Sequence, residues 1–337
     1  MDILININDF DNIINNYFAN ANNGTLIYFK GDDKKKICKF VLDKKECQIT
    51  FYIKNKGVNP QPIGKNKELC SNLLKHLELK GIRDNMPSNQ LLIKDVSVFD
   101  GLILALENEY SEMVTIIKNG NIYKIIGYNN DTITITLNKA NFLIQGKPYY
   151  VFHIIITILA ETNIDIDEYI NLTNNFVNIN TPSQAIRDTI KNKIKNSYLY
   201  LTEPAIKAIS TSFSYLSKGV YSEDYSCALT GVFRALEGYL KKLLTQKYSY
   251  TMKSRDQFSM FYKKNGVPSD IDTNINISQL EKDCLNNLYK LYSKRRSYYL
   301  HSTVDPINLP IIENITDAEN IRDEILSEIE RTYNVIF

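Results

Sequence analysis

The chain has 337 residues, of which 44% are hydrophobic and 23% are charged. This is the composition of a folded globular protein and excludes an intrinsically disordered chain. The length allows two or three domains with ample cores. A net charge of +2 excludes a protein that binds nucleic acid through its overall charge alone.

The cysteines and the most apolar segments indicate a cytoplasmic protein. The five cysteines are scattered and lack Cys-x-x-Cys spacing, which predicts reduced thiols and neither a disulfide framework nor a zinc site. The segment Met1–Leu4 lacks the basic region and apolar run of a signal peptide. The most apolar stretch, residues 149–160, is too short to span a bilayer, so we expect a buried helix and no membrane association.

Residues 1–86 are predicted to form a small α+β domain. Apolar residues at helical spacing predict a first helix over residues 10–18, and alternating patterns predict strands near residues 25–29, 37–42 and 48–53. Residues 59–64 contain two prolines and a glycine and are expected to form a loop. A leucine-rich helix is expected to follow.

Residues 87–177 are predicted to repeat this plan as a second α+β domain. A helix over residues 98–106 leads into strands near residues 113–118, 121–127 and 132–137. A short strand at residues 141–144 and the buried helix at 149–160 complete the unit. The order of elements indicates a duplicated helix and antiparallel-sheet unit.

Residues 178–337 are predicted to form an all-helical bundle. Ile186, Ile190 and Ile194 recur at helical spacing, and a second helix is expected to begin at residues 202–204. Ser222 is the expected N-cap of a third helix with a leucine stripe. Ser278 with Glu281, and Thr316 with Glu319, have the spacing of capping boxes that would start the last two helices.

Charge is unevenly distributed along the helical part. Residues 182–310 contain 19 Lys and Arg against 11 Asp and Glu, a net charge of +8, whereas residues 311–337 contain 2 against 7, a net charge of −5. A basic body followed by an acidic helix is compatible with a site for a polyanion. Solvated helix faces of mixed sign explain the same distribution.

The segment from Lys294 to His301 carries the strongest candidate for chemistry. Arg296 precedes His301 by five positions at the end of a long amphipathic helix. Arginine matches phosphate with a planar fork of donors, and histidine transfers protons near neutral pH. The same residues would also suit a purely structural role, because basic groups in a last helical turn complement the helix dipole.

Arg234 and Glu237 form a second candidate pair on the third predicted helix. Their spacing of three residues allows the carboxylate to hold the guanidinium on one face, opposite the leucine stripe. We expect this helix to pack against the helix that ends at Arg296, which would bring the two pairs together. An ordinary surface ion pair is the alternative.

With these residues in hand, the chain resembles the HEPN ribonucleases, which carry an Arg-x4-6-His motif on a helical bundle. More narrowly, residues 233–242, with Arg-x-x-Glu-Gly, and residues 143–148 are similar to the RnlA/LsoA toxins of bacterial toxin–antitoxin systems. The resemblance implies two domains related to the TATA-binding-protein repeat (TBP-like), at residues 1–86 and 87–177, and a HEPN catalytic and antitoxin-binding domain at 178–337. No residue match supports the first domain, which is assigned from the order of elements.

The resemblance implies a metal-independent toxin endoribonuclease that cleaves mRNA and needs no cofactor. Its catalytic set would be Arg234, Glu237, Arg296 and His301. Arg295 and Tyr298 would bind substrate, and Arg295 also satisfies the looser spacing of the motif, so the essential arginine is either Arg295 or Arg296. The expected partners are RNA, a cognate antitoxin and a second copy of the chain in a homodimer.

Two other classes of function fit the same pattern. One is a nucleic-acid-binding module in which the α+β repeats bind and the bundle dimerises. The other is an interaction protein whose HEPN bundle has no turnover. Binding that survives the loss of His301 would distinguish the first from an enzyme.

Overall fold

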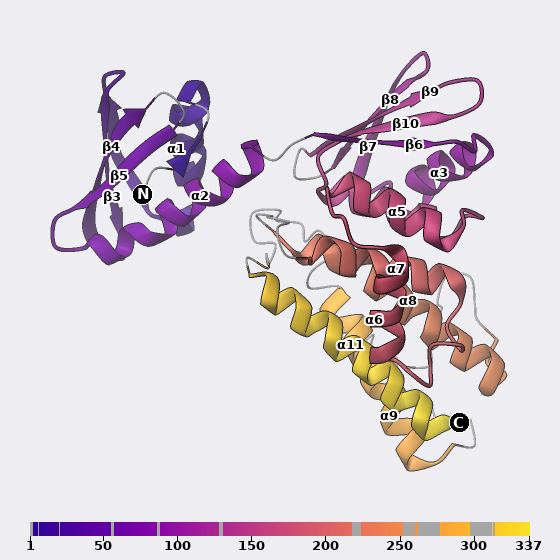
Figure 1. Ribbon diagram of the computed structural model, residues 1–337. Coiled ribbons are helices and arrows are strands. Elements are labelled where there is room, and N and C mark those ends of the chain that lie inside the picture. Colours follow the sequence, from indigo (N-terminus) through magenta and orange to yellow (C-terminus); the bar gives the residue numbers. More distant parts are fainter. Residues whose placement is uncertain are drawn as a thin grey trace. The chain divides into compact units, whose positions relative to one another are not determined.

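The structure is a computed structural model that describes residues 3–5, 7–19, 21–54, 57–85, 88–127, 131–217, 224–251, 258, 261, 277–296, 312 and 314–337. The chain divides into two compact units, one over Met1–Pro87 and the other over Ser88–Val220 with Asp224–Phe337. Both are drawn in Figure 1.

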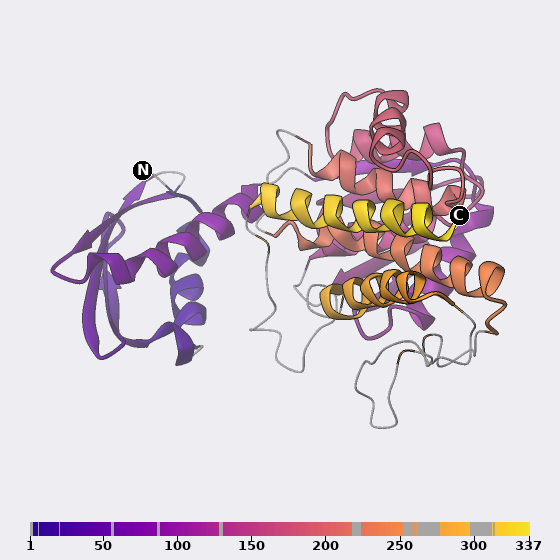
Figure 2. The same ribbon diagram turned by 90° about the horizontal axis from the view of Figure 1, so that it is seen from below.

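The first unit is a five-stranded antiparallel sheet with two helices on one face. Its elements are β1 (Ile3–Leu4), α1 (Phe10–Ala19), β2 (Thr25–Gly31), β3 (Lys35–Leu42), β4 (Lys45–Lys54), β5 (Gly57–Ile63) and α2 (Ser71–Asn85), and the strand order is β1-β5-β4-β3-β2. Alternate residues of β3 and β4 pack inward against both helices, around Phe10, Phe51 and Leu77. Figure 2 shows the same unit from below.

One expectation for this unit was wrong, and one of its strands was not expected. Residues 59–64 were expected to form a loop, but residues 57–63 form strand β5 between β1 and β4. In the described part of the chain, β5 pairs with β1 through Gly57 and Val58, so neither Pro60 nor Pro62 takes part in that described pairing. Strand β1 itself was not predicted, since two residues carry no periodic signal.

The second unit contains a sheet with the same connectivity, which confirms the predicted repeat of the plan. Strands β6 (Asn89–Ile93), β7 (Val114–Asn119), β8 (Ile122–Gly127), β9 (Thr132–Leu137) and β10 (Phe142–Gly146) are ordered β6-β10-β9-β8-β7. Helix α3 (Ser97–Asn108) follows β6, and α4 (Tyr150–Leu159) follows β10. The first strand of this copy, β6, was also absent from the expected elements.

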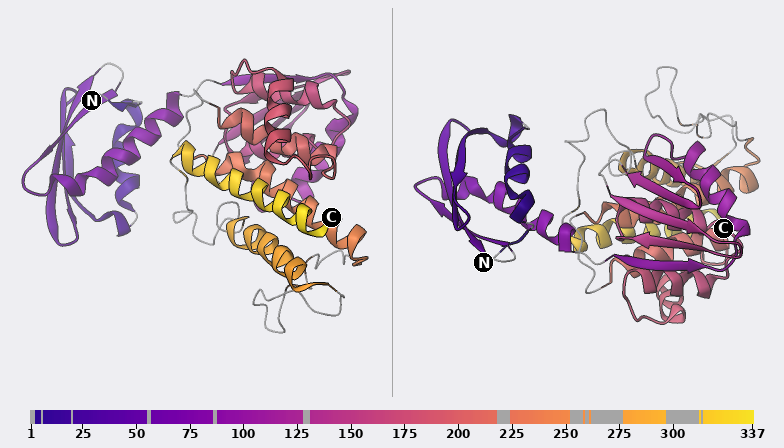
Figure 3. Two further views of the ribbon diagram at one scale, coloured as in Figure 1. Left: turned by 60° about the horizontal axis from the view of Figure 1, so that its bottom comes forward. Right: turned by 90° about the horizontal axis from the view of Figure 1, so that it is seen from above.

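Helices complete the second unit on one face of its sheet (Figure 1). They are α5 (Ile166–Phe176), α6 (Ser183–Lys193), α7 (Glu203–Tyr215), α8 (Thr230–Lys242), α9 (Gln279–Lys290) and α11 (Ile315–Ile336). Helices α8 and α9 continue as π-helical turns over Leu243–Lys247 and Leu291–Arg296. In the right-hand view of Figure 3 the opposite face of the sheet is turned to the reader, with the helices behind it.

The predicted helix starts have mixed outcomes. Ser278 and Glu281 form the predicted capping box at the start of α9. The last helix is instead capped by Asn314, whose side chain accepts a hydrogen bond from the backbone N–H of Thr316, because Asn314 is the residue with extended backbone before the first turn. Ser222 lies outside the described residues, and the helix it was expected to cap begins at Thr230.

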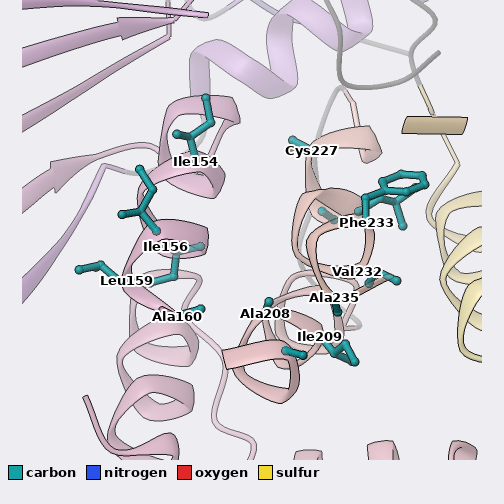
Figure 4. Packing of buried hydrophobic residues seen from close by; sticks show 14 of the residues in the cluster. Ile154, Ile156, Leu159, Ala160, Ala208, Ile209, Cys227, Val232, Phe233 and Ala235 are labelled. Carbon is teal, nitrogen blue, oxygen red and sulfur yellow. The ribbon is translucent and has the colours of Figure 1, made fainter. Parts of the chain in front are cut away.

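One hydrophobic core joins the second sheet to the helices. All ten residues of α4 are buried, and α4 lies between the sheet and α8. Helices α7 and α8 approach so closely that a Cβ at Gly231 would lie 2.0 Å from the carbonyl oxygen of Ala208. Figure 4 shows these helices around Ala208 and Phe233. The predicted domain boundary near residue 177 falls within this shared core and stays a prediction.

The remaining sequence features concern thiols and membranes. All five cysteines are buried and free. Among the helices of the described residues, none has the length and apolarity needed to cross a bilayer.

Candidate active site

Arg234 is the centre of a charged cluster on α8. Its Nε donates a hydrogen bond to Oε1 of Glu161 at 2.7 Å, and its Nη2 lies 3.4 Å from Oε2 of Glu109. Glu109 follows α3 and Glu161 follows α4, so both come from the α+β part of the second unit. Arg234 therefore links the helix bundle to the ends of α3 and α4, the helices that cover the sheet.

The surroundings of Arg234 keep it charged. Burial of the guanidinium, the largest influence on its pKa, acts to lower that pKa, but the hydrogen bond and charge of Glu161 and the charge of Glu237 together raise it. Its side chain remains 29% exposed. The result is a permanently positive group in a fixed orientation that solvent still reaches.

Glu237 does not hold Arg234 in the way the sequence indicated. It was expected on an open helix face, but it is only 5% exposed because α8 is packed on nearly all sides. Its closest cation is Lys241, whose Nζ lies 2.6 Å from Oε1, whereas Nη1 of Arg234 lies 3.8 Å from Oε2. Glu161 is thus the main partner of the arginine, and Glu237 bridges Arg234 and Lys241.

The helix that leads to Arg296 runs antiparallel to α8 and packs against it, as predicted. The hydroxyl of Tyr248, just beyond the C-terminal end of the α8 π turn, donates to Oε1 of Glu281 in the first turn of α9. The π turn Leu291–Arg296 also contacts α8. Single π turns occur frequently at functional sites.

Part of the predicted catalytic set lies beyond what the structure describes. The backbone of Arg295 and Arg296 is the end of the π turn Leu291–Arg296. Tyr298 and His301 lie outside the described residues. The structure therefore places Arg234 and Glu237 together, and aligns their helix with the segment that precedes His301.

The other two histidines of the chain have structural surroundings. His153 is 1% exposed within α4 and lies edge-on to the ring of Tyr215 at 4.3 Å between centroids. Burial lowers the pKa of His153 to about 3, so it is neutral and sealed from substrate. His76 lies 5.0 Å from the ring of Tyr17 in the first unit.

Sequence reasoning missed Glu109, Glu161 and Lys241. Lys241 is four residues from Glu237 on the same helix face, a spacing that would have revealed it. Glu109 and Glu161 are 125 and 73 residues from Arg234, and only the fold brings them there. In the described part of the chain, no group of His, Cys, Asp and Glu is arranged to hold a metal ion.

Comparisons with known proteins give consistent results for the second unit. Residues 182–303 match the family model described as "RNase LS, bacterial toxin DBD domain", and residues 88–164 match the one described as "RNase LS, bacterial toxin". No curated protein matches the chain significantly. Among solved structures, Escherichia coli toxin LsoA in complex with T4 phage antitoxin Dmd is similar at 18% identity, with 74% of this chain and 100% of that chain covered and a TM-score of 0.44.

Proposed function

Because the chain belongs to the RNase LS (RnlA-type) family of bacterial toxins, we propose that it is an endoribonuclease that cleaves mRNA without a metal ion. In this proposal the helical part of the chain is a HEPN-type ribonuclease bundle. The two repeated sheets are TBP-like domains at residues 1–86 and 87–177. Residues 178–337 form the catalytic and antitoxin-binding domain.

The proposed reaction uses the nucleophile that RNA carries. The ribose 2′-oxygen attacks the adjacent phosphorus while the bond from phosphorus to the 5′-oxygen breaks. His301 accepts the proton of the 2′-hydroxyl, and an acid returns a proton to the departing 5′-oxygen. The products are a 2′,3′-cyclic phosphate and a 5′-hydroxyl, so neither water nor a cofactor enters the step.

The arrangement of Arg234 carries the proposal. Three carboxylates, those of Glu109, Glu161 and Glu237, surround its guanidinium, and α8, which carries it, contacts the π turn Leu291–Arg296. A fixed cation in a partly buried site stabilises the negative charge that grows on the phosphoryl oxygens in the transition state. In this proposal Arg234 and Arg296 contact the phosphate, Glu237 orients Arg234, and Arg295 and Tyr298 bind the flanking RNA.

The number of available histidines favours a dimeric enzyme. His153 is sealed in the core and His76 belongs to the first unit, which leaves His301 as the acid–base group of this site. One histidine does not easily serve as both base and acid in the same step, whereas a twofold dimer would supply two. We therefore propose a homodimer as the active form.

A cognate antitoxin is the proposed regulator. The similar LsoA was solved in complex with the antitoxin Dmd. Residues 182–310 of this chain carry a net charge of +8, so an inhibitor with an acidic or polar surface would complement them. The proposed system is therefore of type II, in which a protein antitoxin binds the toxin.

Single substitutions test the catalytic assignment. We expect His301→Ala and Arg296→Ala to abolish cleavage of a labelled single-stranded RNA and the growth arrest that expression causes, while thermal unfolding stays that of the wild type. Arg295→Ala, assayed in parallel, shows which arginine is essential. The matched control is Lys290→Ala, an exposed change earlier on the same helix. Wild-type cleavage rates in both the His301 and Arg296 variants would refute the site.

Chelation tests the absence of a metal. Cleavage in excess EDTA is expected to equal that in magnesium, because 2′-hydroxyl attack requires no metal-bound water. The cleaved 5′ fragment should carry a 2′,3′-cyclic phosphate, identified by mass spectrometry. Activity that is lost on chelation and restored by magnesium or manganese would contradict the mechanism.

A further inference from the structure

The outer face of the first sheet combines lysines with tyrosines. Residues that alternate with the inward core residues of β2, β3 and β4 point away from α1 and α2, as the strand register requires. These outward positions include a single acidic residue, Glu46. Their four lysines and two tyrosines are Tyr28, Lys30, Lys35, Lys39, Tyr52 and Lys54. Tyr52 is 43% exposed at the middle of the sheet.

The lysines and tyrosines are paired in space. Nζ of Lys30 lies 4.7 Å from the ring centroid of Tyr28, two residues away on β2, and Nζ of Lys35 lies 5.8 Å from that of Tyr52, its cross-strand partner. The two tyrosines are on either side of β3, level with Lys39 and Lys35, which places them roughly 16 Å apart. Each aromatic ring therefore has a cation beside it.

The equivalent face of the second sheet lacks this combination. Within the described strands β6 to β10, the outward positions carry Lys124 and otherwise mainly threonine, isoleucine, leucine and glutamine. Tyr123 points inward and is 8% exposed. Since the two sheets share one connectivity, the fold itself does not require lysines and tyrosines on the outer face of the first.

We propose that this face of the first unit, centred on Tyr28 and Tyr52, binds single-stranded RNA and presents it as substrate. Exposed tyrosines stack on unpaired bases regardless of sequence, and lysines beside them neutralise the phosphates. Gln48, Asn59 and Gln61 on the same face supply hydrogen bonds to base edges. The inference deepens the proposed function and rests on it in taking this RNA as the substrate.

Binding is best measured in the full-length His301→Ala chain, so that the result does not depend on cleavage. The probe is a short fluorescein-labelled oligouridylate, followed by fluorescence anisotropy. Tyr28→Ala and Tyr52→Ala should each raise the Kd by about fivefold to a hundredfold, whereas Tyr28→Phe and Tyr52→Phe, which keep the ring, should bind like the parent. The double variant Lys30→Gln/Lys35→Gln should reduce the slope of log Kd against the logarithm of the salt concentration by roughly 1.4.

The second sheet provides matched controls. Ile117→Ala and Lys124→Gln change exposed outer positions there and should leave the Kd unchanged. An equal loss of affinity in these controls, or unchanged affinity in the Tyr28→Ala and Tyr52→Ala variants with wild-type unfolding temperatures, would overturn the proposal. Tyrosine variants that keep RNA affinity but lose the antitoxin would identify the face as a protein-docking surface instead. If binding is as expected but the wild-type chain never cleaves RNA, only the proposed function fails.

Discussion

At the scale of single residues, Arg234 has two tasks that a mutation can separate. Its charge serves the proposed transition state, and its hydrogen bond to Glu161 holds α8 against the end of α4. The three carboxylates around it repel one another when the cation is removed. Stability and activity therefore respond differently to different substitutions.

For Arg234→Gln we expect kcat to fall by about 10²–10³, the usual cost of losing one fixed donor to a developing oxyanion. The same change should lower the free energy of unfolding by roughly 1–3 kcal/mol, because Glu161 and Glu237 lose their shared cation. Arg234→Lys keeps the charge and should recover most of the stability but little of the rate, since the planar fork is lost. Stopped-flow cleavage and denaturant unfolding measure the two effects, and equal recovery of both would contradict a catalytic role.

Glu161→Gln tests whether Arg234 is positioned by a residue of the α+β part of the second unit. The substitution keeps the shape of the side chain but removes the charge that raises the pKa of Arg234. Cleavage should fall by about tenfold through kcat, with KM changed little. Glu168→Gln, on the neighbouring helix α5, serves as the control and should cleave normally.

At the scale of elements, α11 is anchored by an acidic residue. Glu330 accepts hydrogen bonds from the backbone N–H of Asn196 and from the backbone and hydroxyl of Ser197, in the segment between α6 and α7. Burial acts to raise the pKa of Glu330, but the hydrogen bonds from Ser197 and Asn196 outweigh it, and the pKa is lowered from its ordinary 4.5. The ionised carboxylate is thus the form that the fold stabilises.

Glu330→Gln should lower the free energy of unfolding by roughly 1–3 kcal/mol at pH 7. Because the folded pKa is depressed, the contribution of Glu330 is complete above pH 4.5 and is lost as the pH falls through the folded value. The difference between wild type and variant should therefore shrink in acid. Urea titrations at a series of pH values measure it, and a difference that does not change with pH would show that the charge is irrelevant.

At the scale of the whole molecule, each unit has its own hydrophobic core. A chain that begins at Ser88 should consequently fold and keep its kcat. It should lose the proposed RNA contacts of the first sheet, which would raise KM by about tenfold or more. Single-turnover and steady-state kinetics of the shortened chain test this. A large loss of kcat with an unchanged circular dichroism spectrum would instead show that the first unit takes part in catalysis.

The sequence predicted those parts of the fold that local patterns encode. Alternation in β3 and β4, the apolar run of α4 and the Ser278–Glu281 capping box each depend on neighbours within a few residues. Strand β5 was missed because its two prolines disfavour a strand locally, whereas its pairing with β1 joins residues that are distant in sequence. The partners of Arg234 were missed for the same reason: Glu109 and Glu161 are distant in sequence, and no periodicity reports such a contact.

The packing of α11 on α9 also bears on when a newly made chain becomes harmful to its cell. Proteins leave the ribosome from the N-terminus onward, and each unit folds as it is completed. The first sheet is complete long before α9 is translated, whereas α9 packs against α11, which is translated later still. The proposed RNA-binding face would thus be complete early, and the proposed cleavage activity would arise only after α11 has been translated. This leaves an interval in which an antitoxin can bind the chain before it is active.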